Sequence, residues 1–306
     1  DRPGDPSDCL PAHGPRTDKI TGTCGLSRRH GNRIVTASAN IITLTTDFGL
    51  RDGFVGVMKG VIAARAPQAP LIDISHDIRA FDISGAGFLV EWACSYFPEG
   101  TVHTVVVDPG VGTARDVLVF ETRGQRILCP DNGILSLLWA ERAEPCRLVV
   151  AENRALWLND ISGTFHGRDI FAPLAAFLAT GGDLDRVGPP REKPAVLLPP
   201  PLIDYGKKEI QSEIIYIDRF GNLVTTIKRN ALLEWLKERN ATPSETVIRL
   251  GTTCIYGISD CYSAVEEGFP VVVFDGYGRL EIAINLGRAD RVLNAVIRDR
   301  VTISLS

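Results

Sequence analysis

Hydrophobic and polar positions follow two patterns along the chain from Ile41 onward, one typical of strands and one typical of helices. Short apolar runs at 41–46 (IITLTT), 70–75 (PLIDIS) and 101–107 (TVHTVVV) are typical of strands. Between them, GFVGVMKGVIAARAP and ISGAGFLVEWACSYF place apolar residues at helical spacing, and Pro67 ends the first of these helices. Strands that alternate with helices predict a layered α/β domain with a mostly parallel sheet. The nearly all-apolar third run suits a parallel strand that is covered on both faces.

Further elements complete the first domain before the pattern changes beyond residue 206. A hairpin is expected at VLVFETRGQRILCPD, turning at Gly124, followed by helices at about 134–141 and 168–179. Beyond residue 206, SEIIYIDRFGNLVTTI reads as two alternating strands around a Phe-Gly-Asn turn. A short helix near ALLEWLKER precedes further short strands in TVIRLG, FPVVVFD, RLEIAIN and RVTISLS. The pattern beyond residue 206 therefore predicts a smaller, mainly antiparallel C-terminal domain that resembles a β-barrel.

Composition divides the 306-residue chain into four segments. Residues 1–40 are rich in Pro, Gly, Ser and charge and have no periodic apolar face, which predicts a disordered extension. That extension also lacks the apolar core of a secretory signal. The N-terminal α/β domain is expected at 41–188 and the C-terminal β domain at 206–306. Residues 189–205, in a stretch with six prolines, are expected to be the linker between them.

Charge and cysteine usage exclude several classes of protein. The net charge is −4, so no basic surplus indicates a nucleic-acid partner. No apolar run approaches the roughly 18 residues of a membrane span, and no basic amphipathic helix indicates a membrane surface. The seven cysteines form no C-x-x-C pair, which indicates neither a zinc site nor a disulfide framework. Free thiols favour a reducing compartment and hence a cytoplasmic protein.

Two acidic residues end predicted parallel strands. Asp47 follows the first strand and Asp108 the third, and ligands bind at this edge of open α/β sheets. A lone Asp at such a place is more often a turn former, but two at equivalent positions favour neither the structural role nor the ligand role over the other. The sequence DPGVGTAR after the third strand lacks the third glycine of a dinucleotide fingerprint and leads into a strand, which excludes a Rossmann loop. We expect its glycines to let the loop fold tightly enough to return Arg115 to Asp108.

His166 is the third candidate for chemistry. It precedes a predicted helix in SGTFHGRDIFAP, a loop position where polar groups commonly face ligands. His76 and His103 read as structural. The chain has no metal-ligand spacing such as H-x-x-x-H and no G-x-S-x-G nucleophile motif. The candidates thus supply an acid, a base and a cation, without an evident covalent nucleophile.

Seven motifs together resemble one known family. TLTTDFGLRDGFVGVMKG, DISHDIRAFDISGAGFLV, YFPEGTVHTVVVDPGVGTAR, CPDNGILS, TFHGRDIFAP, IDRFGNLVTTI and GRLEIAIN occur in the order seen in the S-adenosylmethionine hydroxide adenosyltransferases. The resemblance covers about residues 41–306. It implies hydrolysis of S-adenosyl-L-methionine to adenosine and L-methionine, in a fold shared with the fluorinase and chlorinase. It also implies a homotrimer with sites between subunits, and neither a metal nor a redox cofactor.

The resemblance assigns roles to individual residues. The family's triad around the attacking water falls on Asp108, Arg115 and His166, the same three that local context selects. The remaining assignments are Asp47 to the ribose hydroxyls; Asp52 and Asp218 to the methionine amine; Asn222 and Tyr262 to adenine; Phe220 to substrate binding; and Phe81 and Phe165 to apolar walls around the sulfonium and the ribose 5′ carbon. The family's carboxylate-binding segment falls on DGYGRLEIAIN, which lacks the usual Ser-containing turn, so no residue is assigned to the methionine carboxylate.

Two alternative functions remain open at the level of the sequence. One is a chlorinase-like halogenase, but a carboxylate at Asp108 would repel a halide, and the hairpin at Gly124 lacks the loop inserted in the fluorinase. The other is a non-catalytic nucleoside-binding protein. That protein would retain Asp47, Asn222 and the aromatic residues, yet it would have no use for the triad.

Overall fold

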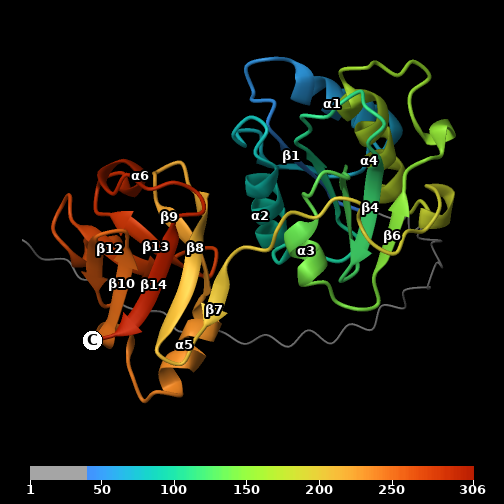
Figure 1. Cartoon of the computed structure of the whole chain (residues 1–306). Helices are drawn as coiled ribbons and strands as arrows, with labels where there is room; N and C mark the ends of the chain where they lie inside the picture. The colour runs from blue at the N-terminus through green and yellow to red at the C-terminus, as the bar shows by residue number, and fades with distance from the viewer. Residues whose placement is uncertain (1–39) are drawn as a thin grey trace, which may run out of the picture. The chain divides into compact units, whose positions relative to one another are not determined.

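The computed structural model describes residues 40–306, so the extension expected at 1–40 lies almost entirely outside the described part of the chain. The first half of this part forms a six-stranded mixed sheet (Figure 1). Its strand order is β2-β1-β3-β5-β4-β6, with parallel pairing from β2 through β5 and antiparallel pairing of β4 with both its neighbours. The strands are β1 (Ile42–Thr46), β2 (Leu71–Ser75), β3 (Val102–Val106), β4 (Val117–Thr122), β5 (Gln125–Pro130) and β6 (Arg147–Val150).

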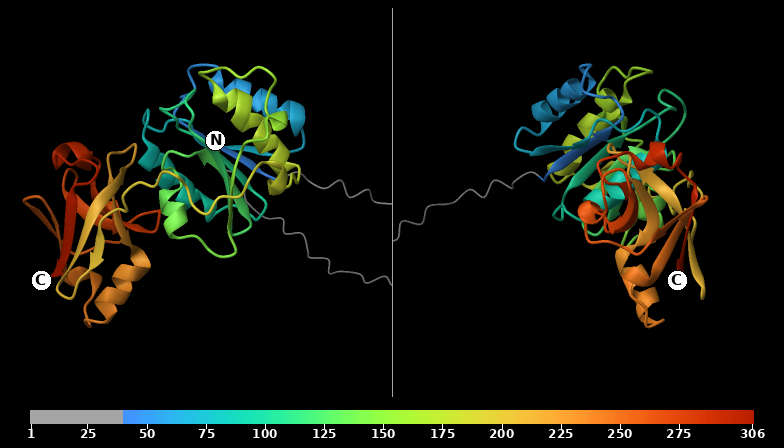
Figure 2. Two further views of the ribbon diagram at one scale, coloured as in Figure 1. Left: turned by 45° about the vertical axis from the view of Figure 1, so that its right-hand side comes forward. Right: turned by 90° about the vertical axis from the view of Figure 1, so that its left-hand side faces the viewer.

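Helices cover both faces of this sheet (Figures 1 and 2). They are α1 (Phe54–Arg65), α2 (Ile83–Cys94), α3 (Ser136–Ala140) and α4 (Ala172–Ala179). On one face, Met58 of α1 and Leu174 of α4 pack with Leu44 of β1. On the other face, Phe88 of α2 packs with Val105 of β3, the strand that leads to Asp108. Because β3 is covered on both sides, the strand end that bears Asp108 is held in a rigid core.

The second half forms an antiparallel sheet that is nearly closed like a barrel. Its strand order is β11-β10-β14-β8-β9-β13-β12, and β7 pairs with β8 outside this path. An isolated bridge between Ser259 and Val273 brings the chain after β11 beside β12. The elements are β7 (Ile203–Tyr205), β8 (Glu209–Ile217), β9 (Leu223–Lys228), α5 (Arg229–Lys237), β10 (Thr246–Leu250), β11 (Thr253–Tyr256), β12 (Pro270–Phe274), β13 (Arg279–Ile284), α6 (Ala289–Val292) and β14 (Arg300–Leu305).

The predicted fold class is confirmed, and the differences lie in short elements. The pattern does not reveal β6, β11 or β7, each of which has only three or four residues. The helix expected at 168–179 begins as a π-helical turn, η2 (Gly167–Phe171), and becomes α-helical only at Ala172. Runs this short span no more than two repeats of a strand pattern or little more than one helical turn, which is too few for periodicity to identify them.

A buried carboxylate fixes part of the proline-rich segment. Asp131 is 3% exposed and accepts hydrogen bonds from Arg191 Nη1 (2.9 Å) and from the backbone N–H groups of Ala195 (3.0 Å) and Val196 (3.1 Å). Residues 191–196 are therefore held against the chain that follows β5. We propose the sequence-based division at 189–205 as the domain boundary, with its first part anchored in this way.

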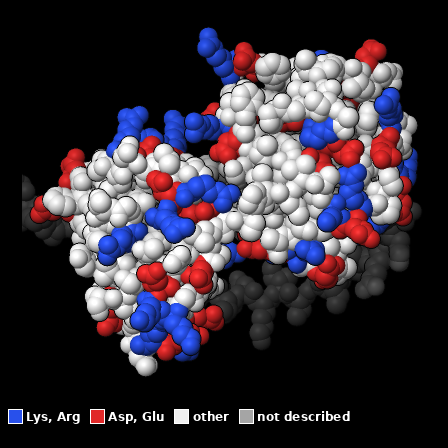
Figure 3. Space-filling view, in the orientation of Figure 1, with Lys and Arg blue, Asp and Glu red and all other residues white. Residues whose placement is uncertain are grey.

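The described surface mixes both signs of charge. In the face shown in Figure 3, Lys and Arg side chains are interspersed with Asp and Glu. Among residues 40–306, no helix combines the length and the apolar character that a membrane crossing requires.

Candidate functional site

Asp108 and Arg115 form a bidentate ion pair at the end of β3. Arg115 Nη1 lies 3.0 Å from Asp108 Oδ1, and Nη2 lies 2.5 Å from Oδ2. The backbone N–H of Gly110 also donates to Oδ1, at 3.1 Å. The two side chains are 3% and 11% exposed, so solvent screens the pair little. The loop returns Arg115 to Asp108, as its spacing predicts, and the planar guanidinium fixes the orientation of the carboxylate.

Gly112 lets this loop approach the one that bears His166. Its φ of 80° lies in the left-handed region that favours glycine. A Cβ atom at this position would lie 2.1 Å from the carbonyl oxygen of Gly163. Any side chain here would therefore push apart the loop that carries Arg115 and the loop that leads into His166.

His166 stands at the N-terminal end of the π-helical turn η2. Its Nδ1 is buried and has no hydrogen-bond partner among the described residues. Burial lowers the pKa of His166 below its usual value, and the positive charge of Arg115 lowers it further, while Asp108 and Asp169 act in the opposite direction. The neutral imidazole, which can accept a proton, is therefore favoured near neutral pH.

Burial acts on Asp108 in the opposite sense. It raises the pKa of the Asp108 carboxyl above its usual value, because it penalises the charged form. Arg115, the N–H of Gly110 and His166 limit that rise. Removing Arg115 would therefore leave a buried carboxyl that holds its proton to higher pH.

Asp108 and His166 line a cavity of about 250 Å³ together with Asp47 and the aromatic side chains of Phe48, Phe81 and Phe165. Asp47, Asp108 and His166 supply its polar walls, and Phe81 and Phe165 supply apolar ones. We call this cavity the triad pocket, although Arg115 reaches it only through its ion pair with Asp108.

Asp47 also holds the backbone of Phe81. Its Oδ2 accepts a hydrogen bond from the N–H of Phe81 at 3.0 Å. Phe81 has a φ of 69°, which is uncommon for a residue with a side chain, and its side chain is 68% exposed. Asp47 therefore has a structural role in this chain, because it fixes the backbone that carries an exposed aromatic ring of the triad pocket.

A second group of expected residues lines a separate hollow of about 720 Å³ beside the β8–β9 turn. Asp218 accepts from the backbone N–H of Asn222 (2.9 Å) and from its side-chain Nδ2 (3.2 Å). Phe220, at the tip of the turn, is 73% exposed, and Tyr262 is 42% exposed. We call this hollow the turn pocket.

Sequence reasoning missed Glu281, a buried acid in the wall of the turn pocket. Tyr262 Oη donates a hydrogen bond of 2.9 Å to Glu281 Oε1. Burial raises the pKa of Glu281 to about 7, and the nearby charges of Asp275 and Asp218 raise it as well. A charged residue inside the apolar run RLEIAI was the signal that could have revealed it.

The expected site residues thus fall into two groups within one chain. The triad pocket and the turn pocket share no lining residue. Asp52, near the start of α1, is exposed and lines neither of them. One chain therefore does not bring all the expected ligand contacts into a single cavity.

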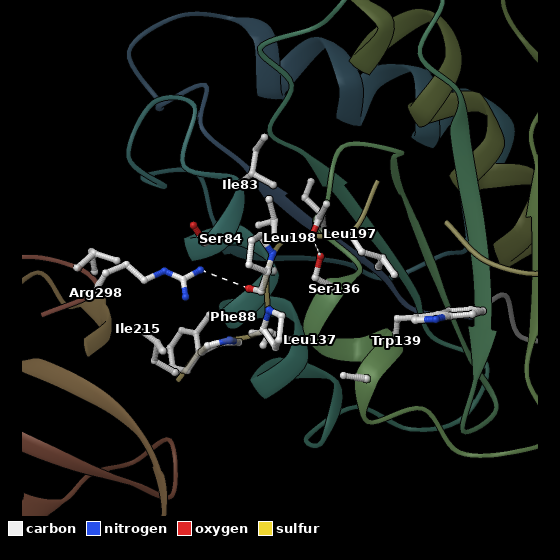
Figure 4. Close-up of a pocket in the computed structure, with 18 residues that line it drawn as sticks. Ile83, Ser84, Phe88, Ser136, Leu137, Trp139, Leu197, Leu198, Ile215 and Arg298 are labelled. Atoms are coloured by element: carbon white, nitrogen blue, oxygen red, sulfur yellow. Dashed lines mark hydrogen bonds between the residues drawn. The ribbon is translucent and has the colours of Figure 1, made fainter. Parts of the chain in front are cut away.

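A third cavity, of about 260 Å³, lies between α2, α3 and residues 197–201 (Figure 4). Its walls are mainly apolar, with Phe88 and Leu137 on the helices and Leu198 on the connecting segment. Arg298 is its only charged wall residue, and that side chain is paired with Glu213. None of the expected site residues lines this cavity.

No group of three or more His, Cys, Asp or Glu side chains within residues 40–306 is arranged to hold a metal ion.

Two family models match the chain. The model of the SAM hydroxide adenosyltransferase N-terminal domain matches residues 42–188, and that of the C-terminal domain of the same family matches residues 212–302.

Three named relatives and a solved structure are similar to most of the chain. A protein of Salinispora tropica named (R)-S-adenosyl-L-methionine hydrolase is 36% identical over 86% of this chain and 97% of its own length. The hydrolase of the same name from Thermus thermophilus is 34% identical over 81% of this chain and 93% of its own. A fluorinase of Actinopolyspora mzabensis is more distant, at 26% identity over 81% and 91%. The crystal structure of an uncharacterised conserved protein from Thermotoga maritima shares 36% identity, with a TM-score of 0.77 over 86% of this chain and 99% of that one.

Proposed function

Because the chain belongs to the SAM hydroxide adenosyltransferase family, we propose that it hydrolyses S-adenosyl-L-methionine to adenosine and L-methionine. In this reaction, the oxygen of water or hydroxide attacks the ribose 5′ carbon in line with the carbon–sulfur bond. That bond breaks, and its electron pair passes to the sulfonium sulfur, which leaves as the neutral thioether of methionine. The leaving group takes no proton, so the protein must supply mainly an oriented, activated water.

The buried Asp108–Arg115 pair beside His166 is the observation that carries this proposal. Asp108 and His166 can accept or orient the protons of the attacking water, and the cation of Arg115 can stabilise its partial hydroxide character. Holding water in line with the scissile bond can contribute several kcal/mol to lowering the barrier. The apolar walls at Phe81 and Phe165 exclude competing water from the sulfonium.

The substrate contacts follow from the residue roles that the family resemblance implies, and all of these residues except Asp52 line one of the two pockets. We assign the ribose hydroxyls to Asp47, the adenine to Asn222, Phe220 and Tyr262, and the methionine amine to Asp52 and Asp218. A carboxylate suits a ribose diol and an ammonium, because both donate hydrogen bonds. Asn222 is held by Asp218 at the turn, so the amide that would face adenine is oriented before the ligand binds.

The sulfonium configuration refines the substrate. The hydrolases of Salinispora tropica and Thermus thermophilus are named for the (R) form of S-adenosyl-L-methionine. We extend this preference to the present chain. No metal or redox cofactor enters the proposed reaction, since a sulfonium is already a good leaving group, and we place the enzyme in the cytoplasm.

Adenosine should form from S-adenosyl-L-methionine at the same rate with and without added chloride or fluoride. A nucleophile beside the Asp108 carboxylate should be water, because that negative charge repels a halide. Chromatography of quenched reactions, run with each sulfonium epimer, measures the products. A 5′-halogenated adenosine as main product would identify a halogenase, and tight adenosine binding with no turnover would identify a nucleoside-binding protein.

The protein should be a homotrimer in solution, with each site completed by a neighbouring copy. The split of the ligand contacts between the triad pocket and the turn pocket supports this assembly, because a trimer can bring one pocket of each type together. The exposed rings of Phe81 and Phe220 would then be covered by substrate and partner. Light scattering coupled to gel filtration measures the mass. A fully active monomer would contradict the shared site.

A further inference from the structure

We propose that Asp169 is a positioning residue for His166, holding the loop at 158–166 so that the imidazole faces the Asp108–Arg115 pair. This inference rests on the proposed function, in which His166 acts on the attacking water. Asp169 lies three residues after His166 in the π-helical turn η2, and π-helical turns occur often at functional sites.

Asp169 closes the loop from inside the fold. Its side chain is 0% exposed. Oδ2 accepts a hydrogen bond from the backbone N–H of Ser162 at 2.8 Å, and Oδ1 accepts from Arg168 Nε at 2.6 Å. The backbone carbonyl of Asp169 accepts from the N–H of Leu158 at 2.9 Å. One residue therefore fixes the loop both at its start and in its middle.

Ser162 extends this restraint to the residue before His166. Its hydroxyl oxygen accepts hydrogen bonds from the backbone N–H groups of Thr164 (3.0 Å) and Phe165 (3.1 Å). The connection from the Asp169 carboxylate to the backbone next to His166 thus consists of two successive hydrogen-bonded steps.

The same loop touches the segment that carries the ion pair. The carbonyl of Gly163 lies against Gly112, so closely that a Cβ atom there would be 2.1 Å away. Displacement of the loop would therefore change the position of His166 relative to Asp108 and Arg115 as well as its own orientation.

Asp169 also contributes charge at His166. Asp108 and Asp169 favour the protonated imidazole, whereas burial and Arg115 favour the neutral one. Asp47 is the remaining charged group in the wall of the triad pocket. Replacing Asp169 by a neutral residue removes one of the two groups that raise the pKa of His166, so that pKa should fall.

Asp169→Asn should lower kcat by roughly 10²-fold, the cost of misplacing a reacting group by about 1 Å, and leave KM unchanged. The acid limb of its activity profile should move to lower pH, because His166 then stays neutral to lower pH. Proton NMR titration of His166, identified by the signal that is lost in His166→Gln, measures the same shift without turnover. Both readouts are compared in the full-length protein.

Asp131→Asn is the matched control. Asp131 is buried, as Asp169 is, and its carboxylate accepts hydrogen bonds from two backbone N–H groups and an arginine. None of these partners belongs to the loop at 158–166, and Asp131 does not line the triad pocket. The Asp131→Asn variant should have a lower melting temperature, as Asp169→Asn should, but the pKa of His166 measured by NMR titration should stay unchanged.

An Asp169→Asn protein with unchanged kcat and unchanged His166 titration would overturn the inference. Should that variant fail to fold, Ser162→Ala is the second test. This substitution lies at a partly exposed site and removes the hydroxyl that accepts hydrogen bonds from Thr164 and Phe165, so it should lower kcat about tenfold. Full activity of Ser162→Ala would overturn the inference equally. An unmodified protein that makes no adenosine refutes the proposed function instead, and the NMR titration still tests the placement of Asp169.

Discussion

Asp108→Asn is expected to lower turnover by roughly 10²–10⁴-fold, the usual range for a lost acid–base group, with little change in substrate affinity. Asparagine keeps the shape of the side chain and can still accept one hydrogen bond from Arg115. It removes the anionic acceptor for the proton of water and leaves part of a buried guanidinium unpaired. The loss should therefore fall on the chemical step.

Isothermal titration measures the affinity for the substrate, and a single-turnover assay measures the rate of the chemical step. Asp47→Asn is the contrasting variant, since its carboxylate is assigned to binding and a hydrogen bond to a charged group contributes about 1.5–3 kcal/mol. That variant should lose mainly affinity, although Asp47 also holds the backbone of Phe81. An Asp108→Asn protein that lost affinity but kept its single-turnover rate would make Asp108 a binding residue.

Arg115→Gln is expected to lower turnover at neutral pH by about 10²–10³-fold, the cost of removing one group that stabilises developing negative charge. It should also move the acid limb of the activity profile to higher pH. Arg115 lowers the pKa of Asp108 against the effect of burial, and it lowers that of His166 as well. Without the cation, both groups hold their protons to higher pH, and part of the activity should return as the pH is raised.

A series of kcat measurements across pH tests this expectation. Arg154→Gln is a suitable control, because Arg154 is an exposed arginine that lies outside the triad pocket and pairs with neither Asp108 nor His166. Its profile should match that of the unchanged protein. An acid limb that stays in place, or moves to lower pH, in Arg115→Gln would show that the cation does not control these protons.

The sequence predicts the alternating strands and helices well because short β-rich runs, such as those at 41–46 and 101–107, alternate with segments whose apolar residues have helical spacing. The Asp108–Arg115 pair is also predictable, since the loop at 107–116 that connects β3 to β4 contains two glycines and can turn tightly enough to bring the two side chains together. Elements of three or four residues, such as β6 and β7, carry too little pattern to be found.

The roles of Glu281 and Asp169 depend on packing that the sequence does not display. The partner of Glu281 is Tyr262, nineteen positions earlier, and the pair forms only when β13 lies beside the 3-10 turn at Tyr262–Ala264. From the sequence alone, Asp169 is an ordinary residue of the predicted helix. In the structure it lies in a π-helical turn, and its carboxylate accepts a hydrogen bond from the backbone N–H of Ser162. The left-handed backbone of Phe81 likewise follows from its bond to Asp47, 34 residues away.

The most direct test of the proposed hydrolysis is the fate of the water oxygen. The unchanged protein is incubated with S-adenosyl-L-methionine in ¹⁸O-labelled water, and the adenosine is examined by mass spectrometry. Attack of water on the ribose 5′ carbon predicts adenosine that carries one ¹⁸O atom at its 5′ oxygen, together with unlabelled methionine. Adenosine without the label, or no adenosine at all, would contradict this account.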